Sequence, residues 1–533
     1  MKTIFCLPTS ALFIIYWLKK NNFQAYLVGG VVRDLYIYHF NDLTKLKEID
    51  YDFTTNAKPT EILSVFPNSF YENSFGTVSL NPQSLYTNII DNDFEMAKDF
   101  FENFAHQLTK PFFIFDQHLK LHQSLQNQKA DTLLTIDKEH LPNYEITTFR
   151  DKEVYGDFRR PNSLVWGCTI TDDLKRRDFT INALALDIDI DFLAKIFSQK
   201  KLPSLITIDS DNYNLIDQHQ SLQDLQNRLI RTVGSADDRF REDALRMMRA
   251  IRLASQLDFK LEKETLQSIK DNYLLIQHIS GERIRDEFLK MLVSNYATEA
   301  ILLLAETKML NYILPELLLT RQVAQSGHHT TDVWQHSLDS LKFCPSKDPI
   351  VKLASLVHDL GKVETQKKVG EKYTFYGHEI IGANLAYQIG KRLKLSRKDC
   401  IRLSTLVRYH MFHYQKFQTD SAIRRFMNKV KLVNLNDIFA VREADRLGSN
   451  AKQSSWRLEE MKERIQAQLY QPLSLKDLCL NGDDLIKKLG LKPSPLIGKI
   501  LDQLMEKVLD DEKLNQKEIL LKLASEMIEK KVS

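Results

Sequence analysis

Two short stretches near the start of the chain decide its fold: AYLVGGVVRD at residues 25–34 and EIDYDFTTN at residues 48–56. The first predicts a strand, a glycine turn and then a helix. The second predicts another strand, with Asp50 and Asp52 two residues apart on one face. Two such carboxylates can share a pair of divalent cations, and a glycine turn before a helix suits a triphosphate. The pattern therefore predicts nucleotidyl transfer with Mg²⁺.

The composition bounds the class of protein. The chain has 533 residues, which is too long for one core and predicts about three or four domains. Its net charge of +3 is small, so a polyanionic partner must be held by local basic patches. The apolar run ALFIIYWL at 11–18 is too short to cross a membrane, and we expect a packing helix there. The scattered cysteines predict reduced thiols and a cytoplasmic location.

Periodicity predicts two halves of different structure. FGTVSL at 75–80 and YEITTFR at 144–150 predict further strands, separated by an unusual helical insert at about 81–143. From about residue 200 onward the apolar spacing predicts helices. Glu145 is a candidate third carboxylate for the metal site.

Two arginine-rich motifs extend the nucleotide site. RRDFTINALALD at 176–187 places Arg176 and Arg177 at the start of a helical run. In FREDALRMMRAIRLASQL at 240–257 we expect Asp243 and Arg246 to share one helix face. The Asp243 carboxylate accepts hydrogen bonds and the Arg246 guanidinium donates them, and such a pair could select cytosine and adenine without a template. Taken singly, a solvated helix cap explains the first motif equally well, and an exposed ion pair on a helix explains the second motif better.

The second half carries a histidine series. His336, the adjacent pair His358 and Asp359, and Asp445 lie on predicted helices, and LVHDLGK at 356–362 is the centre of the series. Imidazole and carboxylate ligands suit a divalent transition metal or Mg²⁺. His378 and His410 are candidates for a second metal. Any one of these histidines alone is better explained as a satisfied buried or exposed residue.

Basic residues recur along the helical half. Arg228 and Arg231, then Arg283 and Arg285, predict a basic face that contacts RNA phosphates. IGKRLKLSRK at 389–398 and IRRFMNKVK at 423–431 are further patches, for which a solvated helix surface is an equal alternative.

The ordered set of motifs resembles the bacterial class II tRNA nucleotidyltransferase/poly(A) polymerase family. LVGGVVRD, IDYDFTT, YGDFRRP, RRDFTINALALD and REDALRMMRAIR occur in that family's order over about residues 23–320, apart from the insert. By resemblance, Asp50 and Asp52 are the catalytic Mg²⁺ ligands, and YGDFRRP with Arg159 and Arg160 is the flexible loop. The nucleotide-binding residues implied are Gly30, Arg33, Arg177, Asp243, Arg246, Arg249 and Arg252.

The resemblance implies an α+β protein, with a mixed-sheet palm head followed by helices. The implied domains are a head at 1–199 with the insert, a helical neck at 200–320, a metal-dependent domain at 326–450 and a helical tail at 456–533. The region 326–450 is similar to the HD phosphohydrolases, which implies a divalent metal bound by the histidine series.

The implied reaction is the template-independent addition of CCA to the 3′ end of tRNA from CTP and ATP. Poly(A) polymerase, CC-only and A-only activities remain alternatives, because these enzymes share the motifs. We expect tRNA, ATP and CTP as partners, and neither DNA nor a membrane.

Overall fold

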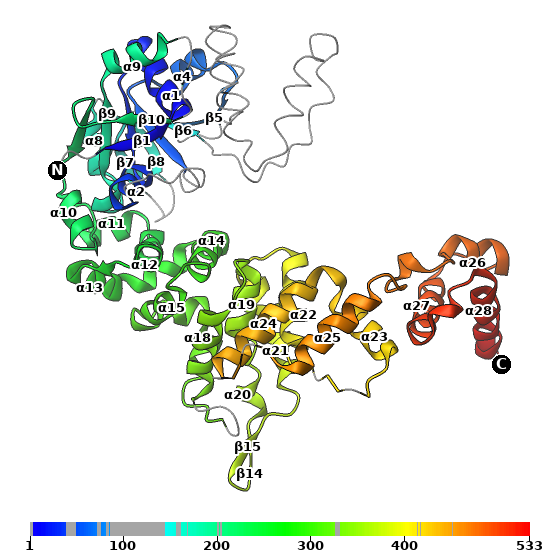
Figure 1. The fold of residues 1–533 in the computed structure, drawn as a ribbon. Helices are drawn as coiled ribbons and strands as arrows, with labels where there is room; N and C mark the ends of the chain where they lie inside the picture. Colours follow the sequence, from blue (N-terminus) through cyan, green and yellow to red (C-terminus); the bar gives the residue numbers. More distant parts are fainter. Residues whose placement is uncertain are drawn as a thin grey trace, which may run out of the picture. The chain divides into compact units, whose positions relative to one another are not determined.

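The computed structural model describes residues 4–38, 50–71, 76–80, 85, 144–155, 161–167, 169–199, 202, 205–325, 331–412, 414–415, 417–449, 451–452 and 454–532. It divides into two compact units, Met1–Ile279 and Ser280–Ser533 (Figure 1). Apart from Leu85, the predicted insert 81–143 lies outside these residues, as do Arg159 and Arg160. The expected domain boundaries stay predictions.

A seven-stranded mixed sheet forms the centre of the N-terminal unit, as the sequence predicts. Its strand order is β11-β9-β2-β3-β6-β5-β4; β3 and β6 are parallel, and the other pairs are antiparallel. The strands are β2 (Ala25–Val28), β3 (Tyr51–Thr55), β4 (Phe70–Tyr71), β5 (Thr77–Leu80), β6 (Tyr144–Thr148), β9 (Leu184–Ile188) and β11 (Tyr213–Asp217). In register, Asp52 on β3 is flanked by Val28 on β2 and by Glu145 on β6.

Helices pack around this sheet. The expected N-terminal packing helix is α1 (Thr9–Lys20), and Lys19 Nζ anchors its last turn to Asp187 at 2.5 Å. The others are α2 (Gly30–Tyr38), α4 (Pro59–Val65), α8 (Ile170–Lys175), η1 (Thr180–Asn182), α9 (Ile190–Phe197) and α10 (Ser221–Gln226). Among the described residues, no helix is long and apolar enough to span a membrane, and the cytoplasmic location stays a prediction.

The prediction that the chain is helical from about residue 200 is wrong for residues 205–217. Strand β10 (Leu205–Ile208) pairs with β1 (Phe5–Pro8), and β11 pairs with β9. These segments are too short for a stable helix, and each finds an open strand edge to pair with. Two later strands, β12 (Leu229–Ile230) and β13 (Lys260–Leu261), form a short parallel pair, and β7 (Arg150–Tyr155) pairs with β8 (Pro161–Trp166).

The expectation that Asp243 and Arg246 lie on one helix is also wrong. Helix α11 (Ala236–Glu242) ends before Asp243, and α12 (Leu245–Leu257) begins after it. Asp243 is extended, with φ −145° and ψ 105°, and its Oδ1 accepts a hydrogen bond from the Leu245 amide at 3.1 Å. An aspartate that caps a backbone amide competes with helical hydrogen bonding, which explains the break. Helix α13 (Lys263–Asn272) and η2 (Tyr273–His278) complete the unit.

The C-terminal unit is helical. It contains α14 (Gly281–Leu292), α15 (Ala297–Glu306), α16 (Leu310–Ile313), α17 (Pro315–Leu318), α18 (Val333–Phe343), α19 (Pro349–Val357), α20 (Lys362–Thr365), α21 (His378–Arg392), α22 (Arg397–Tyr409), α23 (Asp420–Val430), α24 (Leu435–Gly448), α25 (Trp456–Gln468), α26 (Gly482–Leu489), α27 (Pro495–Asp510) and α28 (Lys517–Val532). A hairpin of β14 (Lys367–Val369) and β15 (Lys372–Thr374) interrupts the helices.

Two glycines let the helices of this unit approach closely. A Cβ on Gly361 would lie 2.1 Å from the His378 carbonyl oxygen, and one on Gly448 would lie 2.5 Å from Ser340 Oγ. Any side chain at either position would clash, so these glycines allow α20 to meet α21 and α24 to meet α18.

The basic stretch 423–431 is partly structural. Arg424 is 4% exposed, and its Nε donates to the Leu509 carbonyl at 3.0 Å. Arg425 pairs with Glu506 at 3.5 Å and with Asp510. These two arginines join α23 to α27 and are occupied by protein contacts.

Candidate functional site

The first candidate site lies where the glycine turn meets β3. Gly29 has φ +80°, and a Cβ there would lie 3.0 Å from Arg177 Nη1 and 3.4 Å from Asp52 Oδ2. Glycine is therefore required both by the backbone conformation and by the space. The turn brings backbone amides, a carboxylate and a guanidinium to one place.

The negative charge of Asp52 is only partly compensated by the arginines near it. Burial raises the pKa of Asp52, Arg177 opposes that rise, and the neighbouring carboxylate of Asp50 raises the pKa again. Glu145 lies beside Asp52 on the same face of the sheet, since residues paired in register point the same way. Oxygen ligands that repel one another are the donor set that a divalent cation prefers, so these residues fit Mg²⁺.

Arg177 is held by an aspartate that the sequence analysis did not single out. Asp173 is fully buried, and its two oxygens pair with Arg176 at 2.9 Å and with Arg177 at 3.2 Å. Burial acts to raise the pKa of Asp173, but the two guanidinium groups outweigh it and lower the pKa. Arg177 Nε is buried and forms no hydrogen bond among the described residues. The available signal was the spacing of Asp173 three and four residues before the arginines.

A chain of polar contacts links Arg33 to Arg249 on α12. Arg33 Nη1 donates to Asn182 Oδ1 at 2.8 Å, and Asn182 Nδ2 donates to Asp178 Oδ1 at 3.4 Å. Arg249 then donates to Asp178 Oδ2 from Nε at 2.8 Å and from Nη2 at 2.6 Å. Burial acts to raise the pKa of Asp178, yet Arg249 prevails and lowers it to about 2. No pattern in the sequence indicated that Asp178 and Arg249 meet.

The other predicted nucleotide-binding residues have separate surroundings. Gly30 opens α2, where its α-carbon faces the Arg33 guanidinium. Arg246 is 9% exposed and donates to Glu242 at 2.5 Å. Arg252 donates to Gln256 at 2.8 Å on the same helix. Asp243 lies between α11 and α12, so its backbone conformation at this break determines where its side chain points.

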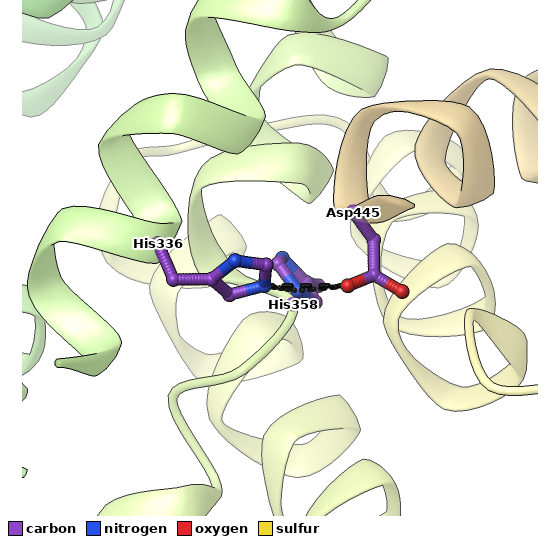
Figure 2. A group of neighbouring side chains, drawn as sticks. All are labelled: His336, His358 and Asp445. Atoms are coloured by element: carbon purple, nitrogen blue, oxygen red, sulfur yellow. Dashed lines mark hydrogen bonds and ion pairs between the residues drawn. The ribbon is translucent and has the colours of Figure 1, made fainter. Parts of the chain in front are cut away.

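The second candidate site is a buried cluster in the C-terminal unit. His336 comes from α18, His358 follows α19, and Asp445 comes from α24; Figure 2 shows their polar atoms converging. His336 Nε2 lies 3.2 Å from His358 Nε2 and 3.3 Å from Asp445 Oδ1. Donor atoms of a tetrahedral site with bonds of about 2.0 Å lie roughly 3.3 Å apart, so these separations fit one bound metal.

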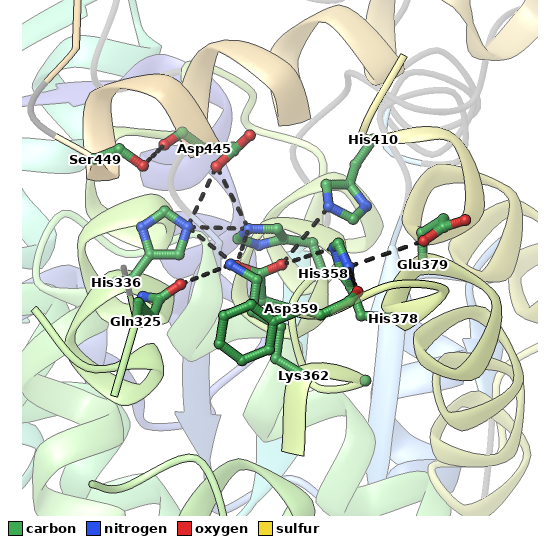
Figure 3. Close-up of polar contacts among 12 residues, drawn as sticks. Gln325, His336, His358, Asp359, Lys362, His378, Glu379, His410, Asp445 and Ser449 are labelled. Carbon is green, nitrogen blue, oxygen red and sulfur yellow. Dashed lines mark hydrogen bonds and ion pairs between the residues drawn. The ribbon is translucent and has the colours of Figure 1, made fainter. Parts of the chain in front are cut away.

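Asp359 joins two further histidines to the cluster (Figure 3). Its Oδ2 lies 3.4 Å from His336 Nε2 and 3.3 Å from His358 Nε2. Its Oδ1 lies 3.4 Å from His378 Nε2 and 3.7 Å from His410 Nε2. The structure therefore brings together all six residues that the sequence analysis named, with the Asp359 carboxylate between two sets of ligands.

Backbone hydrogen bonds fix the tautomers of three histidines. The Nδ1 atoms of His358, His378 and His410 lie 2.8, 2.8 and 2.7 Å from the carbonyl oxygens of Ser355, Phe375 and Val407. A carbonyl can only accept, so each Nδ1 carries a proton, and in the neutral ring each Nε2 has a lone pair. His378 Nε2 accordingly forms no hydrogen bond within the described part of the chain. Metal-binding histidines are oriented in this way.

Opposing charges inside the cluster shift its pKa values strongly. Burial lowers the pKa of His410 to about 3, and His358 contributes in the same direction. Burial also acts to lower the pKa of His358, but Asp359 and Asp445 outweigh it and raise the pKa. Burial acts to raise the pKa values of Asp359 and Asp445, yet neighbouring histidines lower both. The carboxylates are thus ionised and ready to bind a cation.

Lys362 is a cluster residue that the sequence analysis did not name. Its Nζ lies 2.6 Å from Asp359 Oδ2 and donates to Gln325 Oε1 at 2.6 Å. The signal was its place three residues after Asp359 in a helical segment.

Comparisons with known proteins agree with this geometry. The family model for the poly A polymerase head domain matches residues 25–98 and 86–231, and the probable RNA- and SrmB-binding site of polymerase A matches 258–319. The model described as tRNA nucleotidyltransferase domain 2, putative, matches 384–524.

Relatives cover most of the chain. A CCA-adding enzyme of Ligilactobacillus salivarius is 27% identical over 98% of this chain and 97% of its own. An A-adding tRNA nucleotidyltransferase of Deinococcus radiodurans is 32% identical over 63% of this chain and 75% of its own. The crystal structure of the Bacillus stearothermophilus CCA-adding enzyme with CTP has a TM-score of 0.59 at 24% identity, covers 98% of both chains and shows the same fold. The chain is therefore a nucleotidyltransferase and belongs to the family of poly(A) polymerases and tRNA nucleotidyltransferases that includes the CCA-adding enzymes.

Proposed function

We propose that this nucleotidyltransferase adds CCA stepwise to the 3′ end of tRNA, using CTP and ATP. The observation that carries the proposal is the grouping of Asp52, the Gly29 turn and the Arg177 guanidinium where the end of β2 meets the start of β3. The relative from Ligilactobacillus salivarius, which spans nearly the whole chain, is a CCA-adding enzyme and supports this specificity.

In the proposed mechanism, Asp50 and Asp52 would hold Mg²⁺. Bound Mg²⁺ supplies charge neutralisation for the triphosphate and for the attacking 3′-hydroxyl. The turn at Gly30 and the side chains of Arg33 and Arg177 position the triphosphate through amide and guanidinium donors. In this mechanism Asp243, at the break before α12, and the arginines of α12 at 246, 249 and 252 would bind the base and the phosphates and select cytosine and adenine.

An experiment with two primers tests the specificity. The full chain is incubated with tRNA lacking the 3′ CCA or with tRNA ending in CC, each with CTP, ATP or both, and the products are sequenced. CCA on the first primer and a single A on the second are expected. An enzyme that extends only the CC-ended tRNA, and only by A, would overturn the proposal in favour of A addition. Long A tails would instead identify a poly(A) polymerase.

A-only addition is the second candidate for this site. The relative from Deinococcus radiodurans, an A-adding tRNA nucleotidyltransferase, favours it, since it is 32% identical over 63% of this chain. The CC-only activity is distinguished by the same primers, because it would leave CC-ended tRNA unchanged.

We also propose that the buried cluster is a divalent metal centre with phosphohydrolase activity, in a domain at about 326–450. His336, His358, Asp359 and Asp445 would hold one ion, and His378 and His410 could hold a second through the other oxygen of Asp359. Mixed imidazole and carboxylate ligands favour a transition metal, which would supply Lewis acidity toward a phosphate ester. Converging Nε2 lone pairs support this proposal.

Metal binding can be measured without any reaction. The purified chain is stripped of metal, titrated with Mn²⁺, Co²⁺ or Ni²⁺ by calorimetry, and compared with the His358→Ala variant. Tight binding that disappears in the variant is expected. Equal binding by both proteins would overturn the metal centre and leave the proposed CCA addition untouched.

A further inference from the structure

A hairpin next to the buried cluster has no role in the functions proposed so far. Strands β14 and β15 pair from Lys367 with Thr374 to Val369 with Lys372, and Gly370 in the two-residue turn has φ +62°. Figure 1 shows the hairpin extending away from the helices of the C-terminal unit. Residues 367–372 are all exposed, and Val369 keeps 63% of its surface.

Both ends of the hairpin are attached to the cluster. At the first end, Lys362 contacts Asp359 at 2.6 Å, and Gln366 Nε2 donates to the Ala324 carbonyl at 2.9 Å. At the second end, the Phe375 carbonyl accepts the hydrogen bond from His378 Nδ1 at 2.8 Å. The direction of the exposed strands is therefore fixed relative to the metal ligands.

The exposed part of the hairpin carries the chemistry of a phosphate-binding surface. Lys367 and Lys372 lie diagonally opposite on one face, roughly 7–8 Å apart, and Lys368 lies on the other. In the part of the chain that the structure describes, none of these three lysines forms an ion pair. Their ammonium groups are therefore available to bind phosphates.

An exposed aromatic residue lies in the sequence between the hairpin and the cluster residue His378. Tyr376 is 87% exposed and lies two residues before His378. An exposed ring of this size, next to basic strands, provides a stacking surface for an unpaired base. Lysines for the backbone and an aromatic ring for a base are the combination found in binding sites for single-stranded nucleic acid.

We propose that this hairpin, residues 367–376, is a docking arm that leads the single-stranded 3′ end of an RNA to the metal cluster. Lys367 and Lys372 bind phosphates on one face of the hairpin, Lys368 adds positive charge from the other face, and Tyr376 stacks on a base near the terminus. The substrate of the cluster is then an oligonucleotide end rather than a free mononucleotide. This inference rests on the proposed phosphohydrolase activity.

Two measurements on the full chain test the arm. The first compares kcat/KM for a six-nucleotide RNA ending in a 2′,3′-cyclic phosphate with that for a 2′,3′-cyclic mononucleotide. For the variant Lys367→Gln/Lys368→Gln/Lys372→Gln, kcat/KM on the oligonucleotide should fall at least about tenfold. The slope of log(kcat/KM) against the logarithm of the salt concentration should become shallower by about two units. The variant's rate on the mononucleotide should not change. The control Lys487→Gln/Lys488→Gln/Lys492→Gln removes the same charge from exposed sites around α26 and should behave as the parent.

The second measurement does not need catalysis. The same RNA with 5-iodouridine near its 3′ end is photo-crosslinked, and the attached peptide is mapped by mass spectrometry. A crosslink at Tyr376 supports the arm. If no crosslink forms there and the lysine variant keeps the oligonucleotide rate, the arm is overturned while the phosphohydrolase stands. A crosslink at Tyr376 without hydrolysis of either substrate would overturn the phosphohydrolase and leave the arm.

Discussion

The two candidate sites both gather carboxylates for divalent cations, but they differ in how complete the protein leaves them. In the N-terminal unit, Asp50 is exposed and Asp52 half-buried, and burial with carboxylate repulsion raises the pKa of Asp52. In the C-terminal unit, the exposure of the cluster residues ranges from 0% for His336 to 9% for Asp445, and neighbouring histidines lower the pKa of both aspartates.

This difference teaches what each site needs from a ligand. In the open site the Arg177 guanidinium only partly offsets the effects of burial and of the Asp50 carboxylate on Asp52, which suits a reaction whose metal and substrates must enter and leave at each step. The buried cluster already has its tautomers and charges arranged, which suits a metal that stays bound.

The largest expected effect comes from removing a carboxylate of the open site. Asp52→Ala should lower single-turnover CTP incorporation by more than the roughly 100-fold typical of an outer-sphere partner, because a direct metal ligand is lost. The measurement is extension of tRNA lacking CCA. The control Asp191→Ala, an exposed carboxylate in the first turn of α9, should retain activity. If Asp52→Ala kept CTP incorporation within about tenfold of the parent, Asp52 would not be a metal ligand.

Removal of a buried ligand should affect only the second site. His358→Ala should lose the tightly bound metal, measured by elemental analysis after dialysis, and its metal-dependent phosphatase activity. CTP incorporation should stay within about twofold, since the ligands of the open site are untouched. The exposed His278→Ala in the N-terminal unit is the matched control. A parallel loss of CTP incorporation would show that the two sites are not independent.

The ion pair between Asp178 and Arg249 gives a test by stability. Arg249→Met leaves a buried carboxylate without its partner and should cost about 3 kcal/mol of unfolding free energy at pH 7, measured in urea. The exposed pair of Arg228 and Asp258 is the control, and Arg228→Met should cost less than about 1 kcal/mol. Equal costs would show that Asp178 tolerates the loss of its partner.

The same pair predicts a pH dependence. The pKa of Asp178 in the folded protein is lowered to about 2, below its unfolded value. Its contribution is therefore complete above about pH 4 and lost as the pH falls through 2. The stability difference between the parent and Arg249→Met should shrink between pH 4 and pH 2. A difference that stays constant over this range would contradict the ion pair.

The smallest expected effect concerns the chain from Arg33 to Arg249. Asn182→Ala removes the acceptor of Arg33 and should raise the KM for CTP and ATP about tenfold, roughly 1.4 kcal/mol, with a smaller change in kcat. Asn56→Ala, which removes a hydrogen bond at 2.7 Å elsewhere in the unit, is the control. An unchanged KM would mean that Arg33 is positioned without Asn182.

Much of the architecture could be predicted from the sequence. The mixed sheet with helices after it, the N-terminal packing helix and the strands on both sides of the insert were confirmed. The errors at residues 205–217 and at Asp243 occur where a distant strand edge or a side-chain cap overrides local helical spacing. The roles of the candidate site residues stay predictions.

By itself, the sequence determined which chemical groups are present and which share an element. A period of two places Asp50 and Asp52 on one face, and short spacing joins His358 to Asp359 and Lys362. Only the tertiary structure decided that Asp178 meets Arg249, that His336 meets Asp445, and that Arg424 is buried among protein contacts. The reason is physical: backbone geometry fixes distances within one element, whereas contacts between distant segments depend on how whole faces pack.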